Sequence, residues 1–179
     1  MNLYVVRHGE TEYNKKGIFQ GHIDVPLNDK GKEQALEISK KIEKIDIDVI
    51  ISSPLTRALQ TAETIANKKK LDIITDKQFI ERSFGKMEGK KPTEELNIDK
   101  FTDFDLNYKG NSIESIIDFQ KRIYSGIEKL KKRYKDKNVL LVTHTGVIEM
   151  VTAYFEGIPK DKKIYTLGIE NCGIRKFEI

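Results

Sequence analysis

The chain has 179 residues, which is long enough for one domain with a hydrophobic core. Charged residues make up 34% of it, and no stretch approaches the roughly 18 apolar residues of a membrane helix, so we expect a soluble protein without a membrane partner. The net charge of +4 is modest and no groove-entering motif is present, which argues against nucleic acid as a partner and suits a small anionic substrate.

Cys172 is the only cysteine, which rules out a disulfide within the chain. The N-terminus lacks the basic and apolar stretches of a signal peptide. We therefore expect a cytoplasmic protein in which Cys172 acts as a small hydrophobic side chain.

Apolar runs and helical spacing alternate along the chain. In chain order, we expect a strand at 2–6, a helix at 28–44, a strand at 49–51, a helix at 54–66, a strand at 73–74, a long helix capped near Ser112 or Ser115, a strand at 138–144, a helix at 147–155, and strands at 163–169 and 173–179. The stretch 81–110 has no clear period and indicates an irregular excursion that covers the substrate. This alternation predicts a single α/β domain over residues 1–179 with a mostly parallel sheet.

Basic side chains follow three of the expected strands. Arg7 and His8 come directly after the first strand, Arg57 follows the second within a few residues, and His144 ends the strand at 138–144. Because ligand sites in open α/β sheets lie outside the carboxyl ends of the strands, these residues are expected at one edge of the sheet. One such histidine could equally be structural, but two at equivalent strand ends favour a site. His22 lies in a polar loop, where a surface histidine is expected.

This residue set suits phosphoryl transfer. Arginine binds phosphate oxygens through paired N–H groups, and a neutral histidine is a competent nucleophile. A second histidine can donate a hydrogen bond to a phosphoryl oxygen, while a general acid is still needed for the leaving group. Two histidines with a carboxylate could instead bind zinc, but the neighbouring arginines would repel a cation and no HExxH spacing is present. We therefore expect neither a metal nor a cofactor.

Six sequence blocks occur in the order of a known family. They are RHGETEYN, FQGHIDVPLNDKGKEQA, ISSPLTRALQTAETI, IERSFGKMEGK, GNSIESIIDFQKRI and VLLVTHTGVI, and they span nearly the whole chain. The sequence thus resembles the histidine phosphatase superfamily, in its phosphoglycerate-mutase-like branch. The resemblance implies a three-layer α/β/α sandwich with a mostly parallel central sheet.

The resemblance also implies roles for individual residues. His8 matches the nucleophile that becomes phosphohistidine, and Glu81 matches the proton donor that later activates water. The remaining expected site residues are Arg7, Arg57 and His144 in the phosphate pocket, Asn14 against the phosphoryl group, Gln20 and Gly21 in the loop that meets the substrate, and Thr11 and Thr145 beside the pocket. The role of Glu81 rests on the resemblance alone, because its surroundings in the sequence are full of acids.

Within the family, the sequence is more similar to phosphatases of the α-ribazole and broad-specificity types than to mutases. Thr145 and Gly146 stand where mutases tend to carry Gly-Asn, and the excursion after Glu81 lacks the mutases' arginine-rich insertion. Arg82 keeps a bisphosphoglycerate-dependent phosphoglycerate mutase open as the alternative. A non-catalytic phosphate-binding module is disfavoured because both the acid and the nucleophile are present.

Specificity for the phosphorylated metabolite is expected to lie in the segment 82–110. Its basic residues Lys86, Lys90 and Lys91 are candidates for substrate contacts, with a solvated basic loop as the alternative. Its aromatic residues Phe101, Phe104 and Tyr108 could wall the pocket or cover the sheet.

Overall fold

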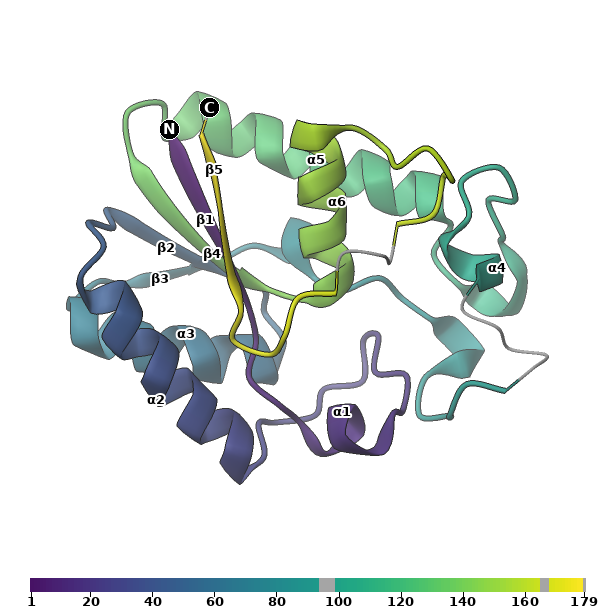
Figure 1. The fold of residues 1–179 in the computed structure, drawn as a ribbon, viewed down its shortest axis with the longest axis horizontal. Helices are drawn as coiled ribbons and strands as arrows, with labels where there is room; N and C mark the ends of the chain where they lie inside the picture. The colour runs from purple at the N-terminus through teal and green to yellow at the C-terminus, as the bar shows by residue number, and fades with distance from the viewer. Residues whose placement is uncertain (94–98, 165–167, 179) are drawn as a thin grey trace.

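The computed structural model describes residues 1–93, 99–164 and 168–178. Its centre is a five-stranded sheet with the order β3-β2-β4-β1-β5 (Figure 1). The strands are β1 (Asn2–Arg7), β2 (Val49–Ser52), β3 (Ile73–Thr75), β4 (Asn138–Thr143) and β5 (Ile174–Glu178). Neighbouring strands are parallel except for β5, which pairs antiparallel with β1. The expected mostly parallel sheet is confirmed.

Helices cover both faces of this sheet (Figure 1). They are α1 (Glu12–Lys16), α2 (Asp29–Glu43), α3 (Thr56–Lys69), α4 (Asp99–Thr102), α5 (Ile116–Arg133) and α6 (Thr145–Glu156), with 3₁₀ turns η1 (Lys77–Phe79), η2 (Gly85–Met87) and η3 (Gly110–Ser112). Asn28 caps α2 and Ser115 caps α5, because each side-chain oxygen accepts a hydrogen bond from a first-turn N–H. None of the helices in the described residues is long and apolar enough to cross a membrane.

Side chains alternate between two hydrophobic cores along the central strands. On β1, Leu3 and Val5 pack with residues of α5 and α6, whereas Val6 packs with residues of α2 and α3. The same alternation holds on β4, whose buried run Val139–Val142 contributes to both cores. Strands buried on both faces read as continuous apolar runs, which explains the sequence pattern. The three-layer α/β/α sandwich is thereby confirmed.

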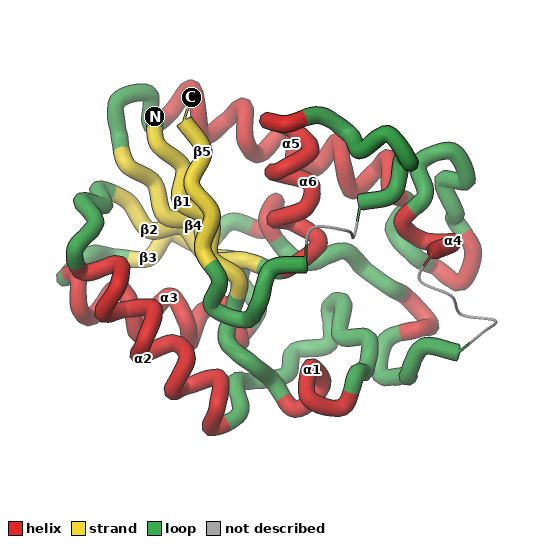
Figure 2. Tube along the Cα trace, viewed as in Figure 1, coloured by secondary structure: helices red, strands yellow, loops and turns green. Residues whose placement is uncertain are grey.

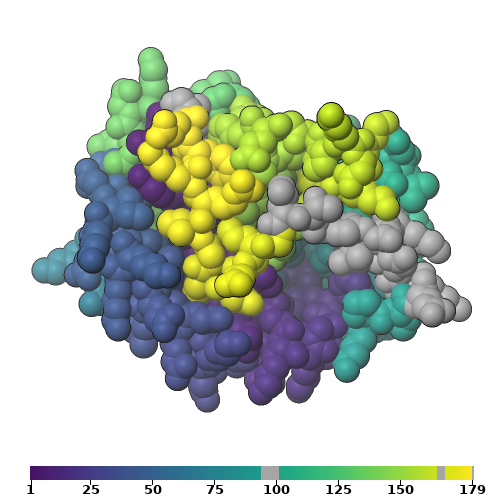
Figure 3. Space-filling view, in the orientation of Figure 1, coloured from purple at the N-terminus to yellow at the C-terminus, as the bar shows by residue number. Residues whose placement is uncertain are grey.

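Two element predictions need correction. The strand expected at 163–169 is absent from the described part of that stretch, where Lys163 forms only an isolated bridge with Asp103; residues 165–167 lie outside the described residues. β5 pairs antiparallel with β1, and in Figure 3 yellow C-terminal residues lie against purple N-terminal residues at the surface. The second correction concerns Pro54, which precedes the N-cap residue Leu55 and so lies just outside α3.

The excursion after η1 consists mainly of loops, and Figure 2 shows these segments beyond the C-terminal ends of the strands. A small apolar cluster of Phe19, Met87, Phe101 and Ile113 stabilises it. Tyr108 packs against this cluster, with its ring centroid 5.2 Å from that of Phe101. Phe101 and Tyr108 therefore pack within this cluster and do not line the cavity described below, whereas Phe84 does line it.

Candidate active site

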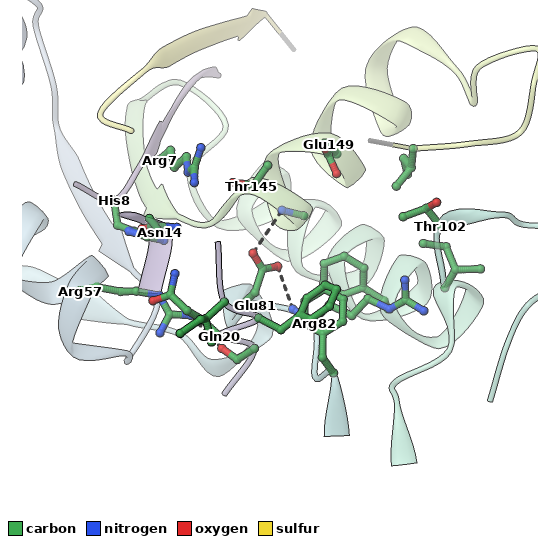
Figure 4. Close-up of a pocket in the computed structure, with 18 residues that line it drawn as sticks. Arg7, His8, Asn14, Gln20, Arg57, Glu81, Arg82, Thr102, Thr145 and Glu149 are labelled. Atoms are coloured by element: carbon green, nitrogen blue, oxygen red, sulfur yellow. Dashed lines mark hydrogen bonds between the residues drawn. The ribbon is translucent and has the colours of Figure 1, made fainter. Parts of the chain in front are cut away.

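A cavity of about 270 Å³ lies at the carboxyl edge of the sheet. Eight of the ten residues expected in the site line it: Arg7, His8, Asn14, Gln20, Gly21, Arg57, Glu81 and Thr145. In Figure 4, His8, Arg7 and Arg57 lie on one side of Glu81. Arg82, Thr102 and Glu149 lie on its other side. The tertiary structure thus brings together side chains from β1, α1, α3, α6 and the excursion.

His8 is held rigidly at the end of β1. Its backbone N–H donates to Thr143 O of β4 at 2.9 Å, and its side chain is 3% exposed. Its Nδ1 lies 2.7 Å from Gly9 O; because a carbonyl only accepts, Nδ1 carries the proton and Nε2 keeps its lone pair. Burial lowers the pKa of His8 well below 6.5, and the positive charges of Arg57 and Arg7 lower it further. The imidazole is therefore neutral, with a free nucleophilic nitrogen.

Two buried guanidinium groups flank this histidine. Arg7 Nη1 donates to Ile169 O at 2.7 Å, and Arg57, in the first turn of α3, donates to Gly21 O and Ile23 O at 2.8 and 2.9 Å. Burial lowers the pKa of both arginines, and the carboxylate of Glu81 opposes that shift. Backbone carbonyls thus fix the two forks, while the Nε atoms of Arg7 and Arg57 have no acceptor among the described residues. The fixed forks concentrate positive charge where an anion enters.

His144 lies next to His8 and is not among the residues that line the cavity, and its buried Nδ1 has no partner among the described residues. Its side chain is fully buried, and its ring centroid is 5.1 Å from that of His8. Its Nε2 lies 2.7 Å from Ser53 Oγ at the end of β2. Burial, followed by the charge of Arg57, lowers the pKa of His144 well below 6.5, so this imidazole is neutral as well.

The carboxyl group of Glu81 is oriented by two backbone N–H groups. Arg82 N donates to its Oε1 at 2.8 Å and Gly146 N donates to its Oε2 at 3.3 Å (Figure 4). A Cβ atom on Gly146 would lie 2.6 Å from Glu81 Oε1. The absence of a side chain at Gly146 therefore leaves room for this acid.

The loop after β1 is stabilised by its own side chains. Thr11 and Asn14 form a reciprocal capping box at α1, and the Thr11 hydroxyl donates to Gln20 Oε1 at 2.9 Å. Thr11 is therefore buried and acts through Asn14 and Gln20, which do line the cavity. This position beside the cavity residues is the one that the resemblance implies for Thr11.

His22 and the excursion's lysines differ in how they relate to the site. His22 is exposed, as expected, yet its Nε2 lies 2.8 Å from Glu81 O and ties the first loop to the acid's backbone. Lys86, Lys90 and Lys91 are exposed and do not line the cavity, so the solvated-loop alternative holds for them. In the described residues no group of three or more His, Cys, Asp and Glu side chains is arranged to hold a metal ion.

Sequence reasoning missed one charged residue of the cavity. Glu149 lines the wall beside Thr145 with its side chain 6% exposed. Burial and the nearby Glu81 raise the pKa of Glu149 to about 8, and Arg7 opposes this rise. The sequence contains one indication of this role, because Glu149 is the single acid in the otherwise mostly apolar stretch 147–155.

Comparisons with known proteins agree with this geometry. The profile of the family described as histidine phosphatase superfamily (branch 1) matches residues 3–179. A Hydrogenobacter thermophilus protein, provisionally named phosphoserine phosphatase 2, is 34% identical over 99% of this chain and 89% of its own. Phosphoglycerate mutase-like protein 4 of Arabidopsis thaliana is 34% identical over 90% of this chain and 73% of its own.

A solved structure extends the likeness to the fold. The phosphoserine phosphatase variant from Entamoeba histolytica, in complex with phosphoserine, superposes with a TM-score of 0.81 at 33% identity, over 99% of this chain and 90% of that one. The family expected from the six sequence blocks is confirmed by both the profile and the structure. The chain belongs to the histidine phosphatase superfamily, branch 1.

Proposed function

We propose that this member of the superfamily is a metal-independent phosphomonoesterase that transfers the phosphoryl group of a small ester first to His8 and then to water. The observation that carries the proposal is the state of His8: it is neutral, its Nδ1 proton is engaged by Gly9 O, and it lies between two guanidinium groups. Phosphatase names among the relatives support the same reaction class.

In the first step, His8 Nε2 attacks phosphorus and the bond from phosphorus to the ester oxygen breaks. Arg7 and Arg57 stabilise the negative charge on the equatorial phosphoryl oxygens, and their unpartnered Nε–H groups supply further donor capacity. Protonated Glu81 delivers its proton to the departing alkoxide oxygen, so that a neutral alcohol leaves.

In the second step, water attacks the phosphorus of phosphohistidine and the P–N bond breaks. Glu81, now ionised, takes the proton of that water, which returns both His8 and Glu81 to their starting states. Inorganic phosphate is the product. His144 supports His8 from behind and, through its neutral ring, adds no charge that would hold the phosphate back.

The alternative, a phosphoglycerate mutase, shares the first step but passes the phosphoryl group to a second anionic substrate. Two contacts disfavour it. Arg82, which suggested a mutase, donates its Nε and Nη1 to the backbone carbonyls of Glu114 and Phe101, so that only its Nη2 is left without a partner among the described residues. Glu149 places a buried acid in the same part of the cavity, and this acid offers no positive charge to a second anionic group.

The phosphohistidine mechanism is tested with p-nitrophenyl phosphate. We expect His8→Ala to lower kcat by about 10³-fold or more, because the Nε2 atom of His8 is the one that attacks phosphorus in this mechanism. Rapid acid-free quenching of the wild type should trap one acid-labile phosphate on His8, and thermal unfolding checks that the variant is folded. Activity that survives in His8→Ala, or activity of the wild type that EDTA removes, would contradict the mechanism.

The mutase alternative is tested with 3-phosphoglycerate in the presence of 2,3-bisphosphoglycerate. A phosphatase releases inorganic phosphate without forming 2-phosphoglycerate. Isomerisation faster than phosphate release would instead establish the mutase reaction.

A single domain over residues 1–179 and a cytoplasmic location stay predictions of the sequence.

A further inference from the structure

The cavity has two chemically different halves. His8, Arg7 and Arg57 form the half that suits a phosphoryl group. The other half must hold the alcohol portion of the ester, and most of its wall is apolar, from Phe84, Ile116, Phe119 and Ile164. Thr102, Arg82 and Glu149 are its polar members (Figure 4). The identity of the alcohol is therefore set mainly by these few polar groups.

Helix α6 fixes Glu149 relative to the phosphoryl half. The helix begins immediately after His144, so its first residue, Thr145, lies beside the phosphate-binding side chains. Glu149 follows four residues later on the same helix face, about 6 Å further along the axis. The ester's alcohol portion would lie over this stretch of helix, within reach of the Glu149 carboxyl group.

Within the part of the chain that the structure describes, the carboxyl group of Glu149 has no hydrogen-bond partner. Its side chain is 6% exposed, yet neither hydrogen bond drawn among the lining residues in Figure 4 reaches it, and it receives none from the described residues. No ion pair within 4.0 Å joins Glu149 to a basic side chain of the described residues, and the positive charge of Arg7 offsets the cost of its burial only in part. Burying an ionised acid without partners lowers the free energy of unfolding, so the acid stays protonated up to its raised pKa of about 8.

We propose that Glu149 binds an ammonium group of the substrate, so that the preferred esters are phosphates of amino alcohols or of hydroxyl-bearing amino acids. The proposal rests on the phosphomonoesterase function above. An ammonium ion supplies the charge and the N–H donors that the carboxyl group lacks, and the apolar wall excludes the water that would compete. Binding is then accompanied by loss of the carboxyl proton of Glu149.

A different role for Glu149 would be to exchange protons with Glu81. The contacts favour the ammonium role, because Glu81 already has two backbone donors and no hydrogen bond joins the two acids. The two roles differ in their effect on substrates. A proton carrier would affect every ester alike, whereas an ammonium-binding residue would affect only the esters that carry the cation.

The test compares two esters of equal size. Phosphoethanolamine carries an ammonium group, and propyl phosphate carries a methyl group in its place. We expect the wild type to show a kcat/KM ratio of at least about 10 in favour of phosphoethanolamine, and Glu149→Gln to reduce that ratio by about 10-fold or more. O-phosphoserine, which also carries an ammonium group, should follow phosphoethanolamine. Glu156→Gln, an exposed acid on the same helix, is the matched control and should keep the wild-type ratio.

Binding is also measured without turnover, so that failure of the chemistry is distinguished from failure of this assignment. In a His8→Ala background, titration calorimetry should show that Glu149→Gln weakens phosphoethanolamine binding by about 10-fold while the preference over propyl phosphate disappears. Three results would overturn the assignment. They are a wild-type kcat/KM ratio near one, an equal loss of kcat/KM for both esters in Glu149→Gln, and equal affinity for the two esters in the His8→Ala background.

Discussion

At the residue scale, the reactivity of His8 depends on one backbone carbonyl and two charges. Gly9 O holds the proton on Nδ1, which leaves the Nε2 lone pair for the phosphorus atom. Burial, and after it the positive charges of Arg57 and Arg7, lowers the pKa of His8 and keeps the ring neutral. In the proposed mechanism the same two arginines also bind the phosphoryl group.

The role proposed for Glu81 predicts a dependence on the leaving group. Glu81→Gln should lower kcat for an alkyl phosphate by about 10² to 10⁴-fold, because an alkoxide needs a proton to depart. The rate of phosphoenzyme formation from p-nitrophenyl phosphate should fall much less, because nitrophenolate can leave without being protonated. Single-turnover kinetics on both esters measures this difference. Glu33→Gln, an exposed acid of α2, is the control, and equal losses on both esters would refute the role.

At the scale of elements, the junction of β4 and α6 organises half of the site. His144 is the single residue between β4 and α6. Thr145 lines the cavity, and Gly146 N donates a hydrogen bond to Glu81. The helix begins earlier than the apolar pattern at 147–155 predicted, because His144 serves as its N-cap position. The N-terminal end of α6 therefore faces the cavity, where its dipole favours both an anionic phosphoryl group and the Glu81 carboxylate.

Gly146→Ala tests whether this close contact positions the acid. The new methyl group would lie 2.6 Å from Glu81 Oε1, and the flexible carboxyl group would move rather than the backbone. We expect kcat for alkyl phosphates to fall by about 10-fold or more, with a melting temperature close to that of the wild type, because alanine favours the helix. Gly168→Ala, where a Cβ meets nothing within 4 Å, should leave both quantities unchanged. A lowered melting temperature with unchanged kcat would contradict this account.

At the scale of the whole molecule, buried ionisable groups are concentrated at one edge of the sheet. His8, Arg57, His144 and Glu149 are each less than a tenth exposed, in a chain whose other core residues are mostly apolar. Such groups reduce the free energy of unfolding, and the two apolar cores above and below the sheet offset this loss. The site is therefore expected to be the part of the fold where stability responds most to pH.

Glu149 predicts the sign of that response. Its pKa is 4.5 in the unfolded chain and about 8 in the fold, so between these values the folded state binds more protons. The free energy of unfolding should thus fall as pH rises from about 5 to 8, by up to about 4 kcal/mol relative to Glu149→Gln. His8 and His144 act in the opposite sense below pH 6.5, because their pKa is lowered by folding. Denaturant unfolding of both proteins across this range measures the difference, and a constant difference would refute the prediction.

Local patterns in the sequence determined the strands, the long helices and the residues at the strand ends. The apolar runs of β1 and β4 predicted buried central strands, and parallel pairing then required Arg7, His8 and His144 to meet at one edge. The capping residues Asn28 and Ser115 also marked helix starts correctly, because a cap acts within a few residues.

Only the tertiary structure decided which side chains face the cavity. Nothing within a few residues of Glu81 distinguishes it from other acids; Gly146 N, 65 positions away, gives it an orientation. Thr11 and His144 lie next to cavity residues without lining the cavity themselves, while Glu149, which the sequence did not indicate, lines its wall. The sequence by itself thus determined the family and the fold, because these follow from local patterns and ordered motifs, and it predicts His8 as the nucleophile through the resemblance. Whether a side chain is buried or faces the cavity depends on packing between residues far apart in the sequence, and local sequence patterns do not reveal that packing.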